Sequence, residues 1–196
     1  MTVLSETVIM NDLRCISSCP VSVEVPILET ERLILRCPAI EDFEAWAAFC
    51  TDQEAGQYIG GALTVHAAWM NLAATIGAWH LRGSGVWSVI EKASGKWVGR
   101  VGAFMPYDWP GPEIGYSFAP AVWGKGYATE AAMAAVDDAF TRLGWPEVLH
   151  LIDERNTASQ AVAQRVGARL IDVIELPGRT GQFQRWRQTR AEWRVR

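Results

Sequence analysis

The stretch "VWGKGYATEAA", residues 122–132, joins a bare backbone to the start of a long helical pattern. Gly124 and Gly126 flank Lys125, and small residues at helical spacing continue to Leu143. The first N–H groups of a helix have no partner within it, and the helix dipole adds positive potential there. Glycine lets such a backbone approach a ligand closely. The stretch therefore predicts either an anion site built from main-chain donors or a tight turn between a strand and a helix.

This glycine stretch departs from two nucleotide-binding patterns. Lys125 is followed by Gly126 rather than by Ser or Thr, so the stretch is not a P-loop. Thr129 stands where the G-x-G-x-x-G pattern needs its last glycine. The stretch by itself favours neither the anion site nor the simple turn, so its neighbours must decide.

The order of elements around the stretch predicts one mixed domain. β-Rich runs predict strands over residues 31–38, 113–119, 148–153, 169–176 and 182–189, and a hairpin over 85–106 with its turn at 93–96. Apolar spacing predicts helices over 40–50, 128–143 and 156–168, and one more that Thr64 caps. In that fourth helix, one face is expected to hold Trp69, Leu72, Ala73, Ile76 and His80. Early helices followed by a long series of strands indicate an α/β (α+β) fold.

The composition limits the class of protein. The 196 residues suffice for one domain with a sizeable core, and 49% hydrophobic with 20% charged residues is an ordinary globular balance. The net charge of −4 argues against a general nucleic-acid binder. No segment has the apolar length to span a bilayer, and the N-terminus does not resemble a signal peptide. We expect a cytoplasmic protein without membrane partners, with an N-terminal extension over 1–25 and a domain over 26–196.

The cysteines and tryptophans suggest packing more than metal chemistry. No C-x-x-C pair occurs among Cys15, Cys19, Cys37 and Cys50, and only three histidines could complete a metal site. We therefore expect reduced thiols and no bound metal, and the alternative is a redox link between Cys15 and Cys19. The ten tryptophans predict a large aromatic core, with the alternative that a few of them line a substrate pocket.

Two motifs in order resemble the GNAT superfamily of acyl-CoA-dependent N-acyltransferases. The first is "EIGYSFAPAVWGKGYATEAA", residues 113–132, in which the family's Arg/Gln-x-x-Gly-x-Gly/Ala pyrophosphate loop aligns with residues 123–128. The second is "NTASQAVAQRVGA", which is similar to the family's Asn-x-x-Ser helix through Asn156, Ser159, Arg165 and Gly167. "ETERLILRCPAIEDFEAWAAF", residues 29–49, resembles the start of the branch that includes the ribosomal-protein alanine N-acetyltransferases. The resemblance covers residues 28–190.

The resemblance implies a fold and a cofactor site. It implies a mixed, mostly antiparallel sheet of about six to seven strands flanked by about four helices, and acetyl-CoA as the cosubstrate. The implied cofactor residues lie on a strand that pairs with pantetheine, on a loop that binds the diphosphate and at the start of a helix. They are Tyr116, Ser117, Phe118, Trp123, Gly124, Lys125, Gly126, Tyr127, Ala128, Thr129, Asn156 and Ser159. Trp123 departs from the family, which has Arg or Gln at that position. A main-chain grip survives this change, and Lys125 is either a replacement cation or a solvated loop residue.

The resemblance also implies a reaction and its residues. The acceptor is a primary amine, on a small molecule or a protein N-terminus, and Glu113 is the candidate base, directly or through a water; otherwise it is a solvent-exposed strand-end carboxylate. Asp108 is a weaker candidate. Ser159 either protonates the leaving thiolate or caps its helix, and Asn156 caps the helix, binds pantetheine or does both. His150 is expected to be satisfied within the fold, and the alternative is that it contacts the substrate. The alternative function is a non-catalytic acyl-CoA-binding module. A homodimer is plausible for the branch.

Overall fold

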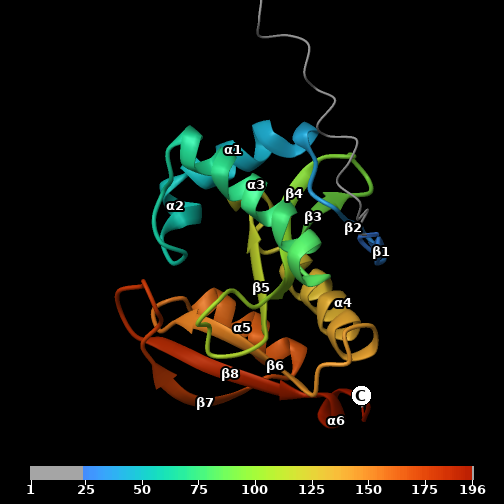
Figure 1. Cartoon of the computed structure of the whole chain (residues 1–196), viewed down its shortest axis with the longest axis vertical. Helices are drawn as coiled ribbons and strands as arrows, with labels where there is room; N and C mark the ends of the chain where they lie inside the picture. Colours follow the sequence, from blue (N-terminus) through green and yellow to red (C-terminus); the bar gives the residue numbers. More distant parts are fainter. Residues whose placement is uncertain (1–23, 196) are drawn as a thin grey trace, which may run out of the picture.

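The computed structural model describes residues 24–195, so Cys15, Cys19 and nearly all of the predicted N-terminal extension lie outside the described residues. Eight strands form one sheet in the order β1-β2-β3-β4-β5-β6-β8-β7 (Figure 1). Their bounds are β1 (Leu28–Glu29), β2 (Leu33–Arg36), β3 (Val86–Glu91), β4 (Trp97–Phe104), β5 (Glu113–Phe118), β6 (Glu147–Asp153), β7 (Arg169–Ile174) and β8 (Phe183–Thr189). Neighbouring strands are antiparallel except for β5 and β6. The mixed, mostly antiparallel sheet is confirmed, with slightly more strands than expected.

The helices include the four that the sequence predicts. The helical segments are η2 (Ile40–Asp42), α1 (Phe43–Thr51), α2 (Gln53–Gly56), α3 (Val65–Arg82), η3 (Pro120–Val122), α4 (Tyr127–Thr141), α5 (Thr157–Val166) and α6 (Arg190–Trp193). The predicted helices are α1, α3, α4 and α5. The extra α2 and α6 have four residues each, which is too short for a periodic pattern.

Local capping signals explain where α3 and α5 begin and end. The Thr64 hydroxyl accepts a hydrogen bond from Ala67 N–H at 3.1 Å, and α3 ends at Gly83 in the left-handed region. Asn156 caps α5 in the same way, and Gly167 ends it. The sequence predicts three of these boundaries, at Thr64, Asn156 and Gly167, and makes no prediction for the end of α3.

The predicted buried face of α3 is partly wrong. The structure buries Ala68, Leu72 and Trp79, whereas Trp69 is 43% exposed and packs its ring edge-on against Phe43. The face is rotated by about one residue because the small Ala68 allows α1 to approach closely, and the indole of Trp79 reaches the core beside Trp87. The large aromatic core itself is confirmed, since Trp46, Trp79 and Trp87 are fully buried.

Helices cover both faces of the central strands. Val101 of β4 packs in one cluster with the α4 residues Ala131 and Ala135. Its neighbour Arg100 faces the other way, over the rings of Trp46 and Phe49 on α1. The alternation along β4 thus places a charged side chain between the sheet and α1.

The sheet opens between β5 and β6. These two strands share a single paired position, Glu113 with Leu149, and beyond it they separate, as Figure 1 shows. Packing of α4 against α5 through Ala132, Val162 and Val166 joins the two halves behind the opening. The resemblance required neighbouring strands that part at this place.

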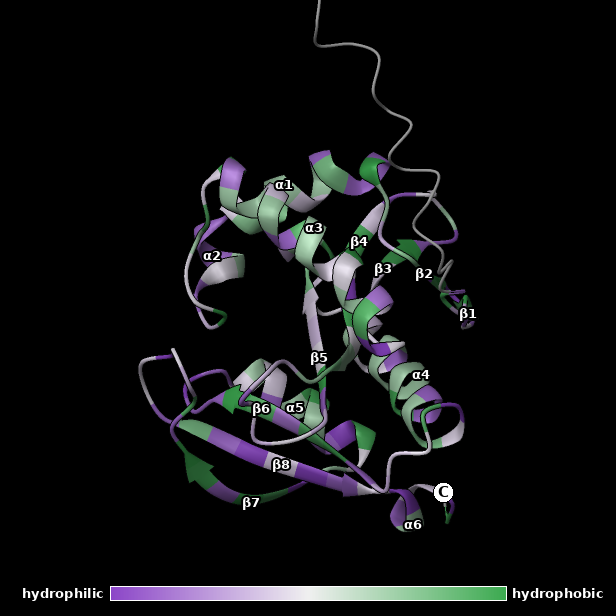
Figure 2. Cartoon of the chain, viewed as in Figure 1, coloured by the Kyte–Doolittle hydropathy of each residue, from purple (hydrophilic) through white to green (hydrophobic). Residues whose placement is uncertain are grey.

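The far edge of the sheet has a different character. Figure 2 shows β8 as largely hydrophilic and the outer strand β7 as largely hydrophobic. On β7, Leu170, Ile171 and Val173 are between 44% and 48% exposed. The predicted homodimer stays a prediction. None of the described helices is long and apolar enough to cross a membrane.

Candidate active site

Two connected cavities lie where β5 and β6 part. The larger, of about 980 Å³, runs along β5, the glycine loop and the starts of α4 and α5. The smaller, of about 330 Å³, lies between β5, β6, α3 and the loops after α2 and β7. Seven residues line both cavities: Phe49, Tyr58, Ile59, Tyr116, Ser117, Asn156 and Ser159. A molecule in the larger cavity can therefore present a reactive group to one in the smaller.

The glycine bend presents main-chain donors to the larger cavity. Gly124 and Gly126 have φ of 78° and 82°, and Gly126 is the N-cap of α4 without a side-chain hydrogen bond. The first bond back to Gly126 comes from Glu130 N–H at 3.1 Å, which leaves the preceding N–H groups as the orphan donors of the helix. The predicted loop residues that line this cavity are Trp123, Gly124, Gly126, Tyr127, Ala128 and Thr129. The bend has the geometry of an anion site.

Arg32 lines the larger cavity, whereas Lys125, the cation that the sequence offered for this role, does not. Lys125 is not among the described residues that line the cavity, and its Nζ lies 5.9 Å from the ring centroid of Tyr127. Arg32 does line the cavity, donates to the Lys125 carbonyl at 2.9 Å and lies over the Tyr127 ring. Glu130 holds Arg32 through its Nε at 2.7 Å. Arg32 was missed because it is far from the loop in sequence, and a lone arginine carries no local signal.

The open edge of β5 leaves one backbone position unused. Alternate residues of an antiparallel strand direct both N–H and C=O to the same side. The Ile114 carbonyl faces the opening and accepts from His150 Nδ1 at 3.0 Å, and the Phe118 carbonyl accepts from Trp123 Nε1 at 2.7 Å. Tyr116 lies in phase between them, so its N–H and C=O face the opening. Of the three predicted strand residues, Tyr116 is best placed to pair with an extended ligand, and Trp123 anchors the end of the strand.

Glu113 lies at the closed end of the opening. Its side chain is buried, with 8% of the residue exposed, so the alternative of a solvent-exposed strand-end carboxylate is wrong. Burial raises the pKa of Glu113 to about 7, although the Trp109 indole donates to its Oε2 at 2.7 Å and the Leu151 backbone also hydrogen-bonds it. The weaker candidate Asp108 is exposed on the preceding loop and lines neither cavity. Glu113 is thus a carboxyl group that can exchange a proton near neutral pH.

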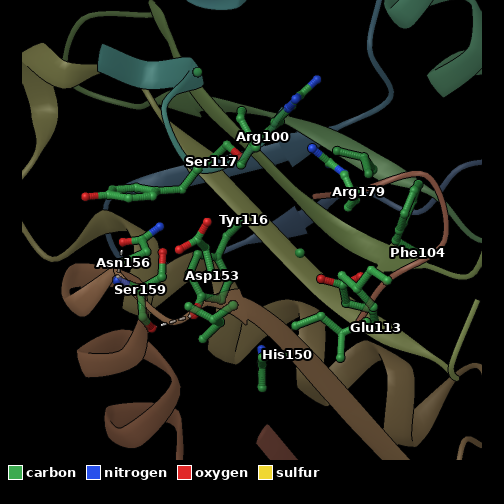
Figure 3. Close-up of a pocket in the computed structure, with 18 of the residues that line it drawn as sticks. Arg100, Phe104, Glu113, Tyr116, Ser117, His150, Asp153, Asn156, Ser159 and Arg179 are labelled. Carbon is green, nitrogen blue, oxygen red and sulfur yellow. Dashed lines mark hydrogen bonds between the residues drawn. The ribbon is translucent and has the colours of Figure 1, made fainter. Parts of the chain in front are cut away.

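The start of α5 is fixed beside β5. Asn156 Oδ1 accepts from Ser159 N–H at 3.1 Å, so its capping interpretation is confirmed. The Tyr116 hydroxyl donates to the Ser159 carbonyl at 2.9 Å, and burial raises the pKa of Tyr116. Figure 3 shows Asn156 and Ser159 side by side at the pocket. The backbone of Ser159 is therefore held in place where the two cavities meet.

The smaller cavity holds charged residues that the sequence did not single out as a group. Arg100, Asp153 and Arg179 line it with Glu113, and Figure 3 shows both arginines on the side opposite Asn156. They come from β4, β6 and the loop before β8, so only the fold brings them together. His150 is 1% exposed, and burial lowers its pKa to about 4, so its ring is neutral at pH 7. Its Nε2 has no partner among the described residues.

The donor set of these cavities does not suggest a metal. Among residues 24–195, no group of three or more His, Cys, Asp or Glu side chains could hold a metal ion.

Comparison with known proteins identifies the family. The model of an acetyltransferase (GNAT) domain matches residues 32–169, which include the glycine bend, Glu113 and Ser159. The chain belongs to the GNAT family of acetyltransferases. It is 32% identical over 153 residues to the uncharacterized protein YkkB of Bacillus subtilis, covering 71% of this chain and 83% of that one.

Solved GNAT structures share the fold. An acetyltransferase from Agrobacterium tumefaciens superposes with a TM-score of 0.76 at 30% identity, over 84% of this chain and 95% of that one. The ribosomal L7/L12 alpha-N-protein acetyltransferase RimL, in complex with coenzyme A, superposes with a TM-score of 0.69 at 17% identity, over 84% and 98%. The second likeness concerns the fold alone. These comparisons confirm the GNAT fold and the acetyltransferase class that the sequence motifs predicted.

Proposed function

We propose that this GNAT protein is an N-acetyltransferase that transfers the acetyl group of acetyl-CoA to a primary amine, with Glu113 as the general base. The observation that carries the proposal is the buried carboxyl of Glu113, with its pKa of about 7, in a cavity that joins the cofactor-sized groove at Ser159. A base is most effective when its pKa lies near the working pH.

The larger cavity suits acetyl-CoA. The orphan N–H groups at the start of α4 would bind the diphosphate, with Arg32 as the nearby cation. The open backbone of Tyr116 would pair with the pantetheine arm, which would bring the thioester to Ser159. Support also comes from the family and from the coenzyme A bound to RimL.

The smaller cavity then holds the amine. Its nitrogen attacks the thioester carbonyl carbon as Glu113 accepts the nitrogen's proton, directly or through a water. The tetrahedral intermediate breaks its C–S bond, the Ser159 hydroxyl donates a hydrogen bond to the leaving thiolate, and the thiolate takes its proton from solvent. Holding both reactants in this geometry can lower the activation barrier by about 7–11 kcal/mol.

The test is a measurement of free thiol released from acetyl-CoA in the presence of a panel of primary amines. Turnover with at least one amine, together with its loss in Glu113→Gln, supports the proposal. Binding of acetyl-CoA without turnover, and indifference to Glu113→Gln, would favour the alternative of a non-catalytic acyl-CoA-binding module.

A further inference from the structure

Two arginines in the smaller cavity have no acidic partner. Arg100 is half-buried beneath α1 and α3, and its Nη1 donates to Asn71 Oδ1 at 2.6 Å. Arg179 reaches in from the loop before β8, and a Cβ placed on Gly60 would lie 2.4 Å from its Nη1. No ion pair among residues 24–195 includes either arginine. Burial, and then the charge of Arg179, lower the pKa of Arg100.

The acidic residues of the cavity do not neutralise this charge. Asp153 pairs with Arg155 at 2.6 Å. Glu113 is hydrogen-bonded by Trp109, and its pKa of about 7 leaves it protonated for about half of the time near neutral pH. The charge of Arg179 affects the pKa of Glu113 less than burial and the hydrogen bonds from Trp109 and Leu151 do. The cavity therefore keeps an excess of positive charge.

This charge is not placed for the phosphates of coenzyme A. Arg100 and Arg179 line the smaller cavity and are absent from the lining of the larger one, whose arginines are Arg32 and Arg165. The glycine bend also belongs to the larger cavity. The guanidinium groups of Arg100 and Arg179 thus lie on the acceptor side of the site.

The floor between Glu113 and Arg100 is clear. Ser117 pairs with Arg100 across the β4–β5 ladder, and Gly115 lies on the same face between Ser117 and Glu113. A Cβ placed on Gly115 would find one heavy atom within 4 Å, Glu113 Oε1 at 4.0 Å. A ligand can therefore lie along β5 with one end at Glu113 and the other toward the arginines. Figure 3 shows the arginine ends gathered on one side of this space.

We propose that the acceptor is a small amine that also carries a carboxylate, which Arg100 and Arg179 bind while the amine faces Glu113. The planar guanidinium matches a carboxylate with two parallel hydrogen bonds, and such charge-assisted bonds are stronger than neutral ones. This inference rests on the proposed function for its reaction, and on the arginine pair for its specificity.

The first experiment compares matched acceptors and matched variants. Thiol release is measured with 4-aminobutyrate and with its neutral amide, and with a short peptide that has an acidic residue after its N-terminal amine. We expect the free amino acid to have the highest kcat/KM. Arg179→Gln should raise the KM for 4-aminobutyrate about tenfold or more and leave that for the amide unchanged. Arg82→Gln removes an exposed charge outside both cavities and should change neither.

The second experiment does not depend on turnover. Calorimetric titration of glutarate into the protein with coenzyme A present should show binding that Arg179→Gln weakens about tenfold, and glutaramide should not bind. Arg100→Gln is a second variant, used with its unfolding midpoint because Arg100 packs on Trp46. Glutarate binding without any turnover would support the carboxylate site and contradict the proposed function. Failure of glutarate to bind, equal rates with the acid and the amide, or a preference for the peptide would overturn this inference.

Discussion

At the scale of single residues, Glu113 decides whether the site is a catalyst. A Glu113→Gln variant keeps the shape of the side chain, and its amide oxygen can still accept the hydrogen bond from Trp109. The amide cannot take up a proton as a base. We expect kcat/KM of the wild type to rise with pH up to the pKa of about 7 and then to level off. The variant should lose about a hundredfold to ten-thousandfold and the pH step with it. Thiol-release rates from pH 5.5 to 9, with the exposed Glu44→Gln as control, check this; an unchanged pH step would contradict it.

The same carboxyl makes stability depend on pH. Its pKa is raised from 4.5 to about 7 in the folded chain, so the folded state binds more protons between these values. The contribution of Glu113 is thus favourable below pH 4.5 and is lost as the pH rises through 7. Relative to the wild type, Glu113→Gln should become more stable between pH 5 and pH 8, by about 3 kcal/mol at most. Urea unfolding at both pH values measures this, and an identical difference at the two would count against the buried, neutral carboxyl.

Residues differ in how far the sequence could predict them. Gly126, Asn156 and Gly167 perform local tasks, such as a left-handed turn or a cap, and their neighbours in sequence show it. Trp109 donates a hydrogen bond to Glu113, and Arg179 lines the smaller cavity. Only the fold brings these residues to their places, so no spacing pattern in the sequence marks them. The indole of Trp123 holds the Phe118 carbonyl, which could not be expected from its place in the loop motif.

At the scale of elements, the start of α4 is the part that we propose to bind the diphosphate of the cofactor. Gly126→Ala would force a side chain into φ of 82°, at a cost to stability of about 1–2 kcal/mol, and would turn the N–H donors away from their common target. We expect the dissociation constant for coenzyme A to rise about tenfold to a hundredfold. Gly95→Ala is the matched control, since it has φ of 68° in the β3–β4 turn with open space around it. It should lose similar stability and keep its affinity; equal affinity losses in both variants would argue against the grip.

A buried ion pair fixes the approach of α1 to the sheet. Asp42 is 4% exposed and accepts from Arg36 at 2.6 Å and from Ser88 at 2.7 Å. Burial alone would raise the pKa of Asp42, but the Arg36, Ser88 and Ala39 donors bring it below its usual value. The stabilisation of the folded state by the ionised Asp42 is therefore present at neutral pH. It is lost as the pH falls through the pKa that Asp42 has in the folded state.

Removing that carboxylate should be costly. Asp42→Ala leaves Arg36 and Ser88 without their acceptor and should lower the free energy of unfolding by about 3 kcal/mol at pH 7. Glu29→Ala breaks the exposed Lys92–Glu29 pair and should cost less than about 1 kcal/mol. Chemical denaturation of both variants gives the comparison. Similar small losses in the two would mean that α1 is held by its apolar contacts alone.

The elements that could be predicted are those that repeat their pattern. The alanines of α4 and the alternating residues of the β3–β4 hairpin extend over several turns or residue pairs. The strand β1 has two residues and α2 has four, so each is defined by hydrogen bonds to distant partners or by a single cap. The face of α3 was misjudged because Trp69 is of a residue type typical of cores, whereas close packing selects the small Ala68.

At the scale of the whole molecule, the sheet is two halves that meet at Glu113 and Leu149. The sequence predicts both motifs that flank this opening, and the resemblance implies that strands part there. The smaller cavity could not be derived in this way, because β4, β6 and the loops after α2 and β7 close it only after the chain has folded. The proposed acceptor site therefore depends on the tertiary structure, whereas the proposed cofactor site depends largely on local motifs.

A ligand in this opening should join the two halves. Coenzyme A at a hundred times its dissociation constant should stabilise the folded chain by about 2.7 kcal/mol. Amide hydrogen exchange should slow at Tyr116, whose N–H faces the opening, and at Tyr127 and Ala128 at the start of α4. The amide of Val89, inside the β2–β3–β4 ladder, serves as the reference for exchange that does not involve the opening. Protection at α4 without protection at Tyr116 would place the diphosphate in the bend but the pantetheine arm outside the sheet, and the thioester would then lie away from Glu113.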